Sequence, residues 1–122
     1  MIWHRSVIAK LETAQLFVKI ALVGGKIRAT IDADRFLDIH YDPDTKSYSY
    51  AVIDTTLPYP GDKRLFGWDD FPHPSAIDLI KLPSYPHHFQ RRVGVIWVFE
   101  DSPMRGNIEE EIDIVIAKVS KF

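Results

Sequence analysis

A chain of 122 residues with 46% hydrophobic and 26% charged side chains has the composition of one globular domain with its own core. It contains no cysteine, which excludes disulfide bonds, thiolate zinc sites and cysteine nucleophiles, and its net charge of −2 excludes a general attraction to nucleic acid. We expect a single domain over residues 1–122 that is cytoplasmic and needs no cofactor. We expect no membrane span, because the apolar run over residues 16–23 is short and interrupted by Lys19.

The first half of the chain predicts β-strands joined by tight turns. Residues 6–12 and 17–23 are β-branched or apolar segments of strand length, and the Gly24-Gly25 pair marks a hairpin turn after them. A second hairpin is expected over residues 37–52, where alternating apolar and polar side chains flank an Asp-Pro-Asp turn at residues 42–44.

The second half predicts two more strands and a closing helix. Residues 64–68 and 93–99 have strand composition, and the latter segment is apolar on both faces, which predicts a central strand. Asn107 begins a capping-box-like sequence, and apolar residues then recur at helical spacing, namely Ile108, Ile112, Val115, Val119 and Phe122. The sequence therefore predicts an α+β fold, a single curved, mostly antiparallel sheet of about six strands packed against a C-terminal helix.

Titratable side chains concentrate between residues 67 and 92, on backbone stiffened by prolines. Histidine both accepts and donates protons near neutral pH, and RNA cleavage without a metal needs one group of each kind. The candidate catalytic residues are His73, His87 and His88, with Asp69 and Asp70 in support.

Candidate substrate-binding residues lie around the same segment. Lys81, Arg91 and Arg92 fall in a stretch without acidic side chains and suit contacts with phosphate groups. Tyr48 and Tyr50 are two residues apart and should share a strand face, where they would either stack on unpaired bases or pack in the core.

The positions of the histidines predict which side chains can share a site. His87 and His88 are adjacent, so on a strand they would point to opposite sides and one of them would enter a given site. We expect His73, Tyr48, His87 and Arg91 to line one shared depression.

Three motifs occur in an order that resembles a known family. They are Tyr48-Ser49-Tyr50, the run FGWDDFPHP over residues 66–74, and Pro86-His87-His88. Together they resemble the TumE-type toxins of toxin–antitoxin systems, over residues 37–94 and a similar closing helix. Asp70 stands where the family pattern has Asn, and Gln90 stands where it has a further His. The resemblance implies a small toxin that is neutralised by a helix-turn-helix antitoxin.

Three classes of function remain open. The first is a metal-independent ribonuclease toxin that uses paired histidines, with RNA as its substrate. The second is a non-catalytic toxin or adaptor that blocks a target by surface contact. The third is a metal-dependent hydrolase or nuclease whose ligands come from Asp69, Asp70, His73 and His87. Homodimer formation is left open by the sequence.

Overall fold

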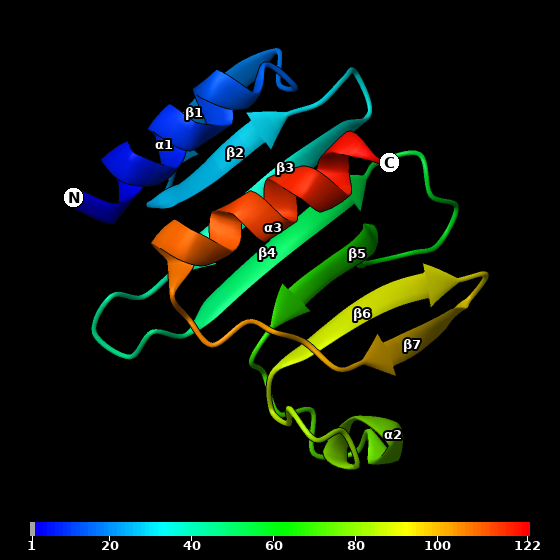
Figure 1. Cartoon of the computed structure of the whole chain (residues 1–122). Helices are drawn as coiled ribbons and strands as arrows, with labels where there is room; N and C mark the ends of the chain where they lie inside the picture. The colour runs from blue at the N-terminus through cyan, green and yellow to red at the C-terminus, as the bar shows by residue number, and fades with distance from the viewer. Residues whose placement is uncertain (1) are drawn as a thin grey trace.

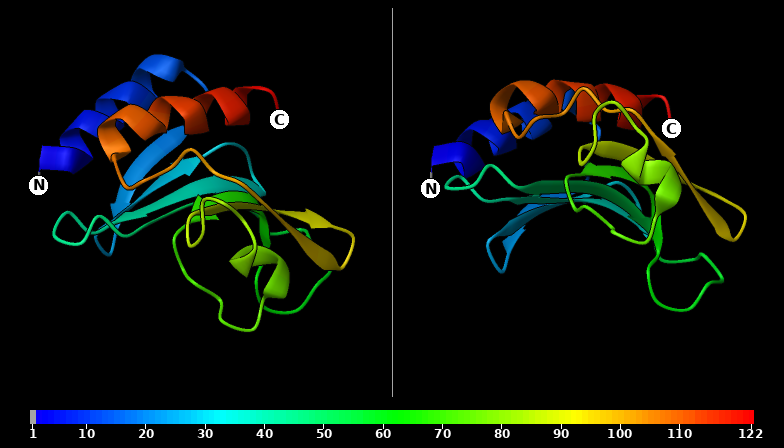
Figure 2. Two further views of the ribbon diagram at one scale, coloured as in Figure 1. Left: turned by 60° about the horizontal axis from the view of Figure 1, so that its bottom comes forward. Right: turned by 90° about the horizontal axis from the view of Figure 1, so that it is seen from below.

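The chain forms one antiparallel sheet with two long helices on one of its faces (Figures 1 and 2). The computed structural model describes residues 2–122. Its seven strands lie side by side in chain order, so each strand pairs with the next one in sequence. The elements are α1 (Ile2–Ala14), β1 (Lys19–Val23), β2 (Lys26–Thr30), β3 (Arg35–Tyr41), β4 (Tyr48–Asp54), β5 (Arg64–Asp69), α2 (Ile77–Ile80), β6 (His88–Val93), β7 (Ile96–Glu100) and α3 (Ile108–Ser120).

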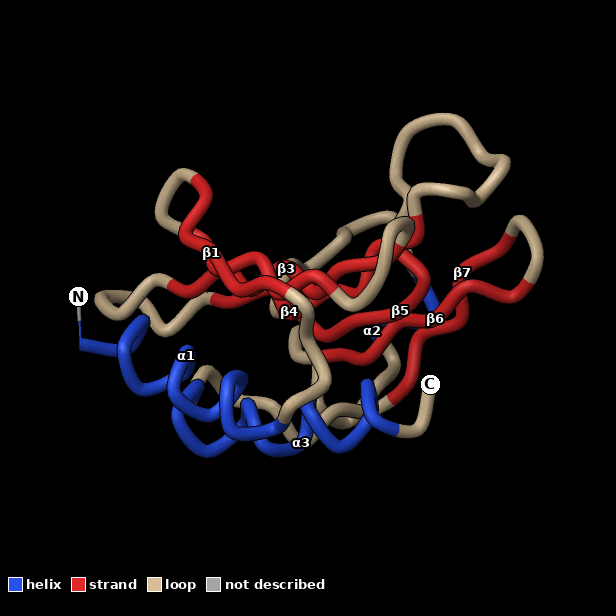
Figure 3. Tube along the Cα trace, turned by 90° about the horizontal axis from the view of Figure 1, so that it is seen from above, coloured by secondary structure: helices blue, strands red, loops and turns tan. Residues whose placement is uncertain are grey.

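The α+β prediction is confirmed, with seven strands in the sheet instead of about six. Helices α1 and α3 both cover one face, and the loop between β4 and β5 projects from the other side, as Figure 3 shows from above. We call the face under α1 and α3 the helix face and the opposite one the open face. Within residues 2–122, no helix combines the length and apolar character that a membrane span requires.

Strand register divides the side chains between the two faces. Trp68 of β5 lies opposite Tyr50 on one side and Phe89 on the other, and all three side chains are buried on the helix face. The neighbouring residue Asp69 lies opposite His88, and this pair points to the open face. The same alternation therefore supplies the core and places polar groups on the far side of the sheet.

Residues 6–12 form part of helix α1, so the strand expected there is wrong. Trp3, Val7 and Leu11 recur every four residues and are all buried, which gives the segment an apolar stripe at helical spacing. Packing of this stripe against the sheet and against α3 outweighs the strand preference of the β-branched residues.

The segment 93–99 is also different from the expectation. Val93 ends β6, Gly94 adopts a left-handed conformation (φ 61°) in the hairpin turn, and β7 is an edge strand. Val93 and Val95 flank Gly94, so the sequence of this turn has the β-branched composition of a central strand.

The closing helix begins where it was expected. Ile108, Ile112, Val115 and Val119 are buried. Asn107 precedes the first turn, but its side chain accepts a hydrogen bond from Lys46 (2.6 Å) and forms no capping bond.

Substitution of Ile112 tests the packing of α3. Ile112 is fully buried, whereas Ile114, on the same helix, is 42% exposed. We expect Ile112→Ala to lower the free energy of unfolding by about 2–5 kcal/mol, because it removes buried methyl groups and leaves a cavity. Ile114→Ala is the matched control and should cost less than about 1 kcal/mol. Urea denaturation measures both values, and equal losses would contradict the packing described above.

Candidate active site on the open face

Three side chains converge on the open face where β5 ends and β6 begins. Asp69 is the last residue of β5, His88 is the first residue of β6, and His73 comes from the loop between them. Each offers one ligand or proton-transfer atom, and these atoms all lie within 4.8 Å of one another. The rings of His73 and His88 have centroids 5.3 Å apart. We call this group the Asp69–His73–His88 cluster.

The Asp69 carboxylate is held from several directions. Its Oδ2 accepts a hydrogen bond from the Arg64 guanidinium (2.7 Å), and its Oδ1 accepts one from the backbone N–H of Phe71 (2.9 Å). Arg64 also donates to the hydroxyl of Ser49 (3.2 Å), which lies opposite Asp69 on β4. The side chain of Asp69 is therefore fixed, and Oδ1 is turned toward His88, 3.2 Å from Nε2.

His88 is fully buried, and its hydrogen bonds define its orientation. Its Nδ1 lies 2.8 Å from the carbonyl oxygen of Pro86, which accepts and never donates, so Nδ1 carries a proton. Its Nε2 faces Oδ1 of Asp69 and lies 3.0 Å from the side-chain oxygen of Gln90. The Nε2 atom of His88, with either a lone pair or a second proton, therefore points into the cluster.

His73 occupies a strained position and is partly buried. Its φ of 35° places a residue with a Cβ in the left-handed region, which costs on the order of 1–3 kcal/mol. Burial lowers the pKa of the His73 imidazole. Its Nε2 is buried and has no hydrogen-bond partner within residues 2–122. The backbone thus holds an imidazole with an unengaged nitrogen against the ring of His88.

His87 lies on the other side of the sheet from His88, as expected for adjacent residues. Its Nδ1 is 3.0 Å from the Tyr48 hydroxyl. Burial raises the pKa of Tyr48, so its hydroxyl stays protonated at neutral pH. Burial, followed by the charge of Arg105, lowers the pKa of His87.

The shared depression expected from the sequence does not form. Tyr48 points to the helix face with His87, whereas His73 joins His88 on the open face. Arg91 points to the helix face as well, opposite Val98 of β7, and pairs with Glu100 (3.4 Å). Alternation along β4 and β6 separates these side chains, and sequence motifs do not reveal this alternation until the strand boundaries are known.

Tyr48 and Tyr50 are packing residues. Their rings are buried and stacked on each other, with centroids 4.8 Å apart. The Tyr50 hydroxyl donates to Oε1 of Glu111 in α3 (3.0 Å), which ties the helix to the sheet. Both ring systems are enclosed, so neither presents a face on which a base could stack.

The cations marked by the sequence lie away from the cluster, and a different one lies in it. Lys81 is exposed after α2, and Arg92 stacks over Trp97 (4.1 Å) while donating to backbone carbonyls. The cation that contacts the cluster is Arg64. It was missed because Arg64 and Asp69 are five residues apart, a spacing that does not place two residues on one strand face.

Asp70 is also outside the cluster. Its Oδ1 accepts hydrogen bonds from the hydroxyl of Ser47 (2.9 Å) and from the backbone N–H of Tyr48 (3.4 Å). The two adjacent aspartates therefore have different tasks, since Asp69 belongs to the cluster and Asp70 ties the start of β4 to the end of β5.

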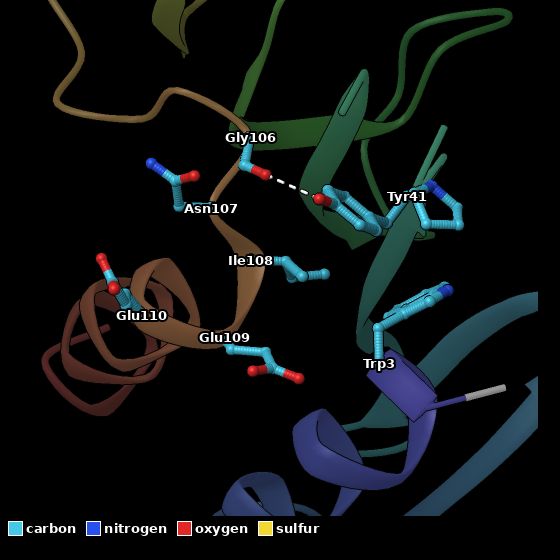
Figure 4. A pocket seen from close by; sticks show the side chains of 8 residues that line it. Trp3, Tyr41, Gly106, Asn107, Ile108, Glu109 and Glu110 are labelled. Carbon is cyan, nitrogen blue, oxygen red and sulfur yellow. Dashed lines mark hydrogen bonds between the residues drawn. The ribbon is translucent and has the colours of Figure 1, made fainter. Parts of the chain in front are cut away.

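An open cavity of about 580 Å³ lies elsewhere, between the start of α1, β3 and the start of α3 (Figure 4). The hydroxyl of Tyr41 donates to the carbonyl oxygen of Gly106 across its wall (2.8 Å). Its lining is Trp3, Tyr41, Pro43, Gly106, Asn107, Ile108, Glu109 and Glu110. This lining includes no member of the cluster.

Comparison with known proteins assigns neither a family nor a function to this chain. No protein-family model, no curated protein and no solved structure matches this chain.

The His87–Tyr48 hydrogen bond predicts a pH-dependent contribution to stability. The pKa of His87 is lowered in the folded state from its ordinary value of 6.5, so folding favours the neutral ring. The stability that His87 contributes should be complete above pH 6.5 and should be lost as the pH falls through the lowered folded pKa. We therefore expect His87→Ala to reduce the free energy of unfolding more at about pH 7.5 than at about pH 5.

Urea denaturation of the parent chain and of His87→Ala at both pH values checks this. His4→Ala, which alters a histidine of α1 that bonds the carbonyl oxygen of Gly25, serves as the control. An equal loss for His87→Ala at the two pH values would show that folding does not favour the neutral ring.

Proposed function

We propose that this protein is an RNA-cleaving toxin of a toxin–antitoxin system and that the Asp69–His73–His88 cluster is its reaction centre. The observation that carries the proposal is the contact between the rings of His73 and His88 beside a fixed carboxylate. Transfer of a phosphodiester needs a proton acceptor, a proton donor and a positive charge near the phosphate. The cluster and Arg64 offer these groups from β5, β6 and the intervening loop.

The members differ in what they are suited to do. His73 is half-buried, whereas Asp69 and His88 are buried, so we assign His73 the position nearest the substrate. His88 is enclosed by Pro86, Asp69 and Gln90. We therefore assign it the role of a positioning residue that orients the Asp69 carboxylate and the ring of His73. Arg64 takes the place of Arg91 and Arg92 as the cation of the site.

The toxin assignment rests on the order of the three motifs that resemble TumE-type toxins. Two of these motifs supply the cluster, since Asp69 and His73 lie in the run over residues 66–74 and His88 ends the Pro-His-His element. A toxin of this kind is neutralised by a helix-turn-helix antitoxin. A reading frame for such a protein beside this one would support the assignment, and its co-expression should relieve growth arrest.

Substitutions of the cluster test the proposed reaction. Expressed alone in a bacterial host, the protein should arrest growth and cleave RNA. We expect His73→Ala to lower the rate of RNA cleavage by about 10²–10⁴-fold, because it removes a proton-transfer group. His88→Gln should also lower the rate. Cleavage of total RNA by the purified protein measures the loss, and circular dichroism shows that each variant is folded.

His87→Ala is the matched control, because it removes the adjacent histidine on the other side of the sheet. It should retain cleavage and arrest. Growth arrest without RNA cleavage in the parent chain, or cleavage unchanged in folded His73→Ala, would contradict the proposal. The first result would favour an adaptor that blocks its target by contact.

A further inference from the structure

We propose that the Asp69–His73–His88 cluster binds one divalent transition-metal ion of the zinc class. The inference uses the same site as the proposed function, and the role of the metal in RNA cleavage rests on that function. Metal binding itself is independent of it. This inference departs from the metal-free mechanism expected from the sequence, and the reason is the burial and orientation of the two imidazoles.

The donor atoms are close enough to share an ion after a small adjustment. Two ligands about 2.0–2.1 Å from a tetrahedral zinc lie about 3.3 Å apart. The Oδ1 of Asp69 and the Nε2 of His88 are 3.2 Å apart, so this pair already has the required separation. His73 supplies the third atom within 4.8 Å, and a shift of its loop by roughly 1.5 Å closes the site.

The protonation of His88 leaves the correct nitrogen for a metal. Metal-binding histidines usually donate their other ring N–H to a carbonyl or carboxylate, which fixes the tautomer. The Nδ1–H of His88 donates to the carbonyl oxygen of Pro86 (2.8 Å), so in the neutral ring the lone pair is on Nε2, the nitrogen that faces Asp69. The side-chain oxygens of Asp69 and Gln90 lie 3.2 and 3.0 Å from this nitrogen.

His73 provides an independent observation. Its Nε2 is buried and has no hydrogen-bond partner among the described residues, and leaving a buried polar atom unpaired costs about 1–3 kcal/mol. The left-handed backbone at His73 adds a further cost. The ring lies against that of His88, and a metal ion bound beside it would account for a strained loop residue with an unpaired ring nitrogen at this place.

The charges around the cluster select the class of metal. One carboxylate and two imidazoles form a nitrogen-rich ligand set, which suits zinc and disfavours magnesium. Arg64 binds the outer oxygen of Asp69 and leaves Oδ1 toward the cluster, so it acts as a supporting partner of the carboxylate.

The metal also resolves a difficulty of the paired-histidine mechanism. His88 is fully buried, and the Nε2 of His73 is enclosed, so the two rings do not offer both nitrogens to an RNA molecule. An ion held by three protein ligands keeps a coordination position for water or a phosphate oxygen. The metal, and not the buried histidine, would then be the group that contacts the substrate.

Titration of the chelator-stripped full chain with zinc chloride tests the inference. Isothermal titration calorimetry near neutral pH should give one zinc ion per chain and no comparable binding of magnesium chloride. We expect Asp69→Asn, His73→Ala and His88→Gln each to weaken zinc binding by at least about 10-fold, because each removes a ligand. Bound cobalt should give a visible absorption spectrum that His73→Ala abolishes.

The chain supplies two matched controls. Asp70→Asn and His87→Ala alter the adjacent aspartate and histidine, whose side chains bond Ser47 and Tyr48 outside the cluster, and both should bind zinc like the parent chain. Circular dichroism checks the fold of every variant, and His73→Ala keeps the test informative should the buried His88→Gln fail to fold.

The outcomes separate the two proposals. Absence of zinc binding by the parent chain, equal binding by the folded His73→Ala variant, or equal affinity for magnesium would overturn the metal site. RNA cleavage at full rate by the zinc-free, chelator-treated protein would overturn the role of the metal in cleavage and leave the proposed function intact. Zinc binding through the cluster without RNA cleavage would support the metal site and overturn the proposed function.

Discussion

The pairing register between β5 and β6 governs both faces of this protein. Trp68 opposite Phe89 and Asp69 opposite His88 are successive pairs of the same ladder. The first pair is buried under the helices, and the second points to the open face. A slip of one residue would carry the aromatic rings to the open face and Asp69 and His88 into the core. Burial of the aromatic rings therefore fixes the position of the polar cluster.

The cluster by itself is a poor source of stability. Removing Asp69, Arg64 and His88 from water carries a desolvation cost that their mutual contacts only partly offset. His73 adds backbone strain and an unpaired nitrogen. Such costs persist where the surrounding structure imposes them, and the core on the helix face does so here. Their concentration around one carboxylate and two imidazoles is the physical basis for assigning a function to this place.

A second buried polar network occupies the helix face. Tyr50 binds Glu111, whose other oxygen accepts the backbone N–H of Arg105 (2.6 Å), and Tyr48 binds His87. This network fastens α3 and the preceding segment to β4. The tyrosines that resemble a nucleic-acid platform in the sequence thus stabilise the layer opposite the cluster, and the two networks share only the sheet between them.

The sequence by itself determined the α+β class, the two hairpins over residues 17–52, the closing helix and the segment that carries the cluster, because local periodicity and turn residues report on these features. The sequence also predicted that His87 and His88 diverge, from the alternation of a strand, although β6 begins only at His88. Only the tertiary structure decided which of them joins His73. That choice depends on where β6 begins. Arg64 faces the cluster because the register between β4 and β5 shifts beside it, and strand alternation alone does not predict such an irregularity.

The N-terminal helix and the edge position of β7 were likewise decided by tertiary packing. The stripe of Trp3, Val7 and Leu11 gains its stability by covering a sheet that the local sequence does not contain. Tyr48 and Tyr50 shared a face as the sequence predicted, but the sequence did not say which layer that face meets. Patterns along the chain record periodicity, whereas the choice between burial and exposure depends on contacts between residues far apart in sequence.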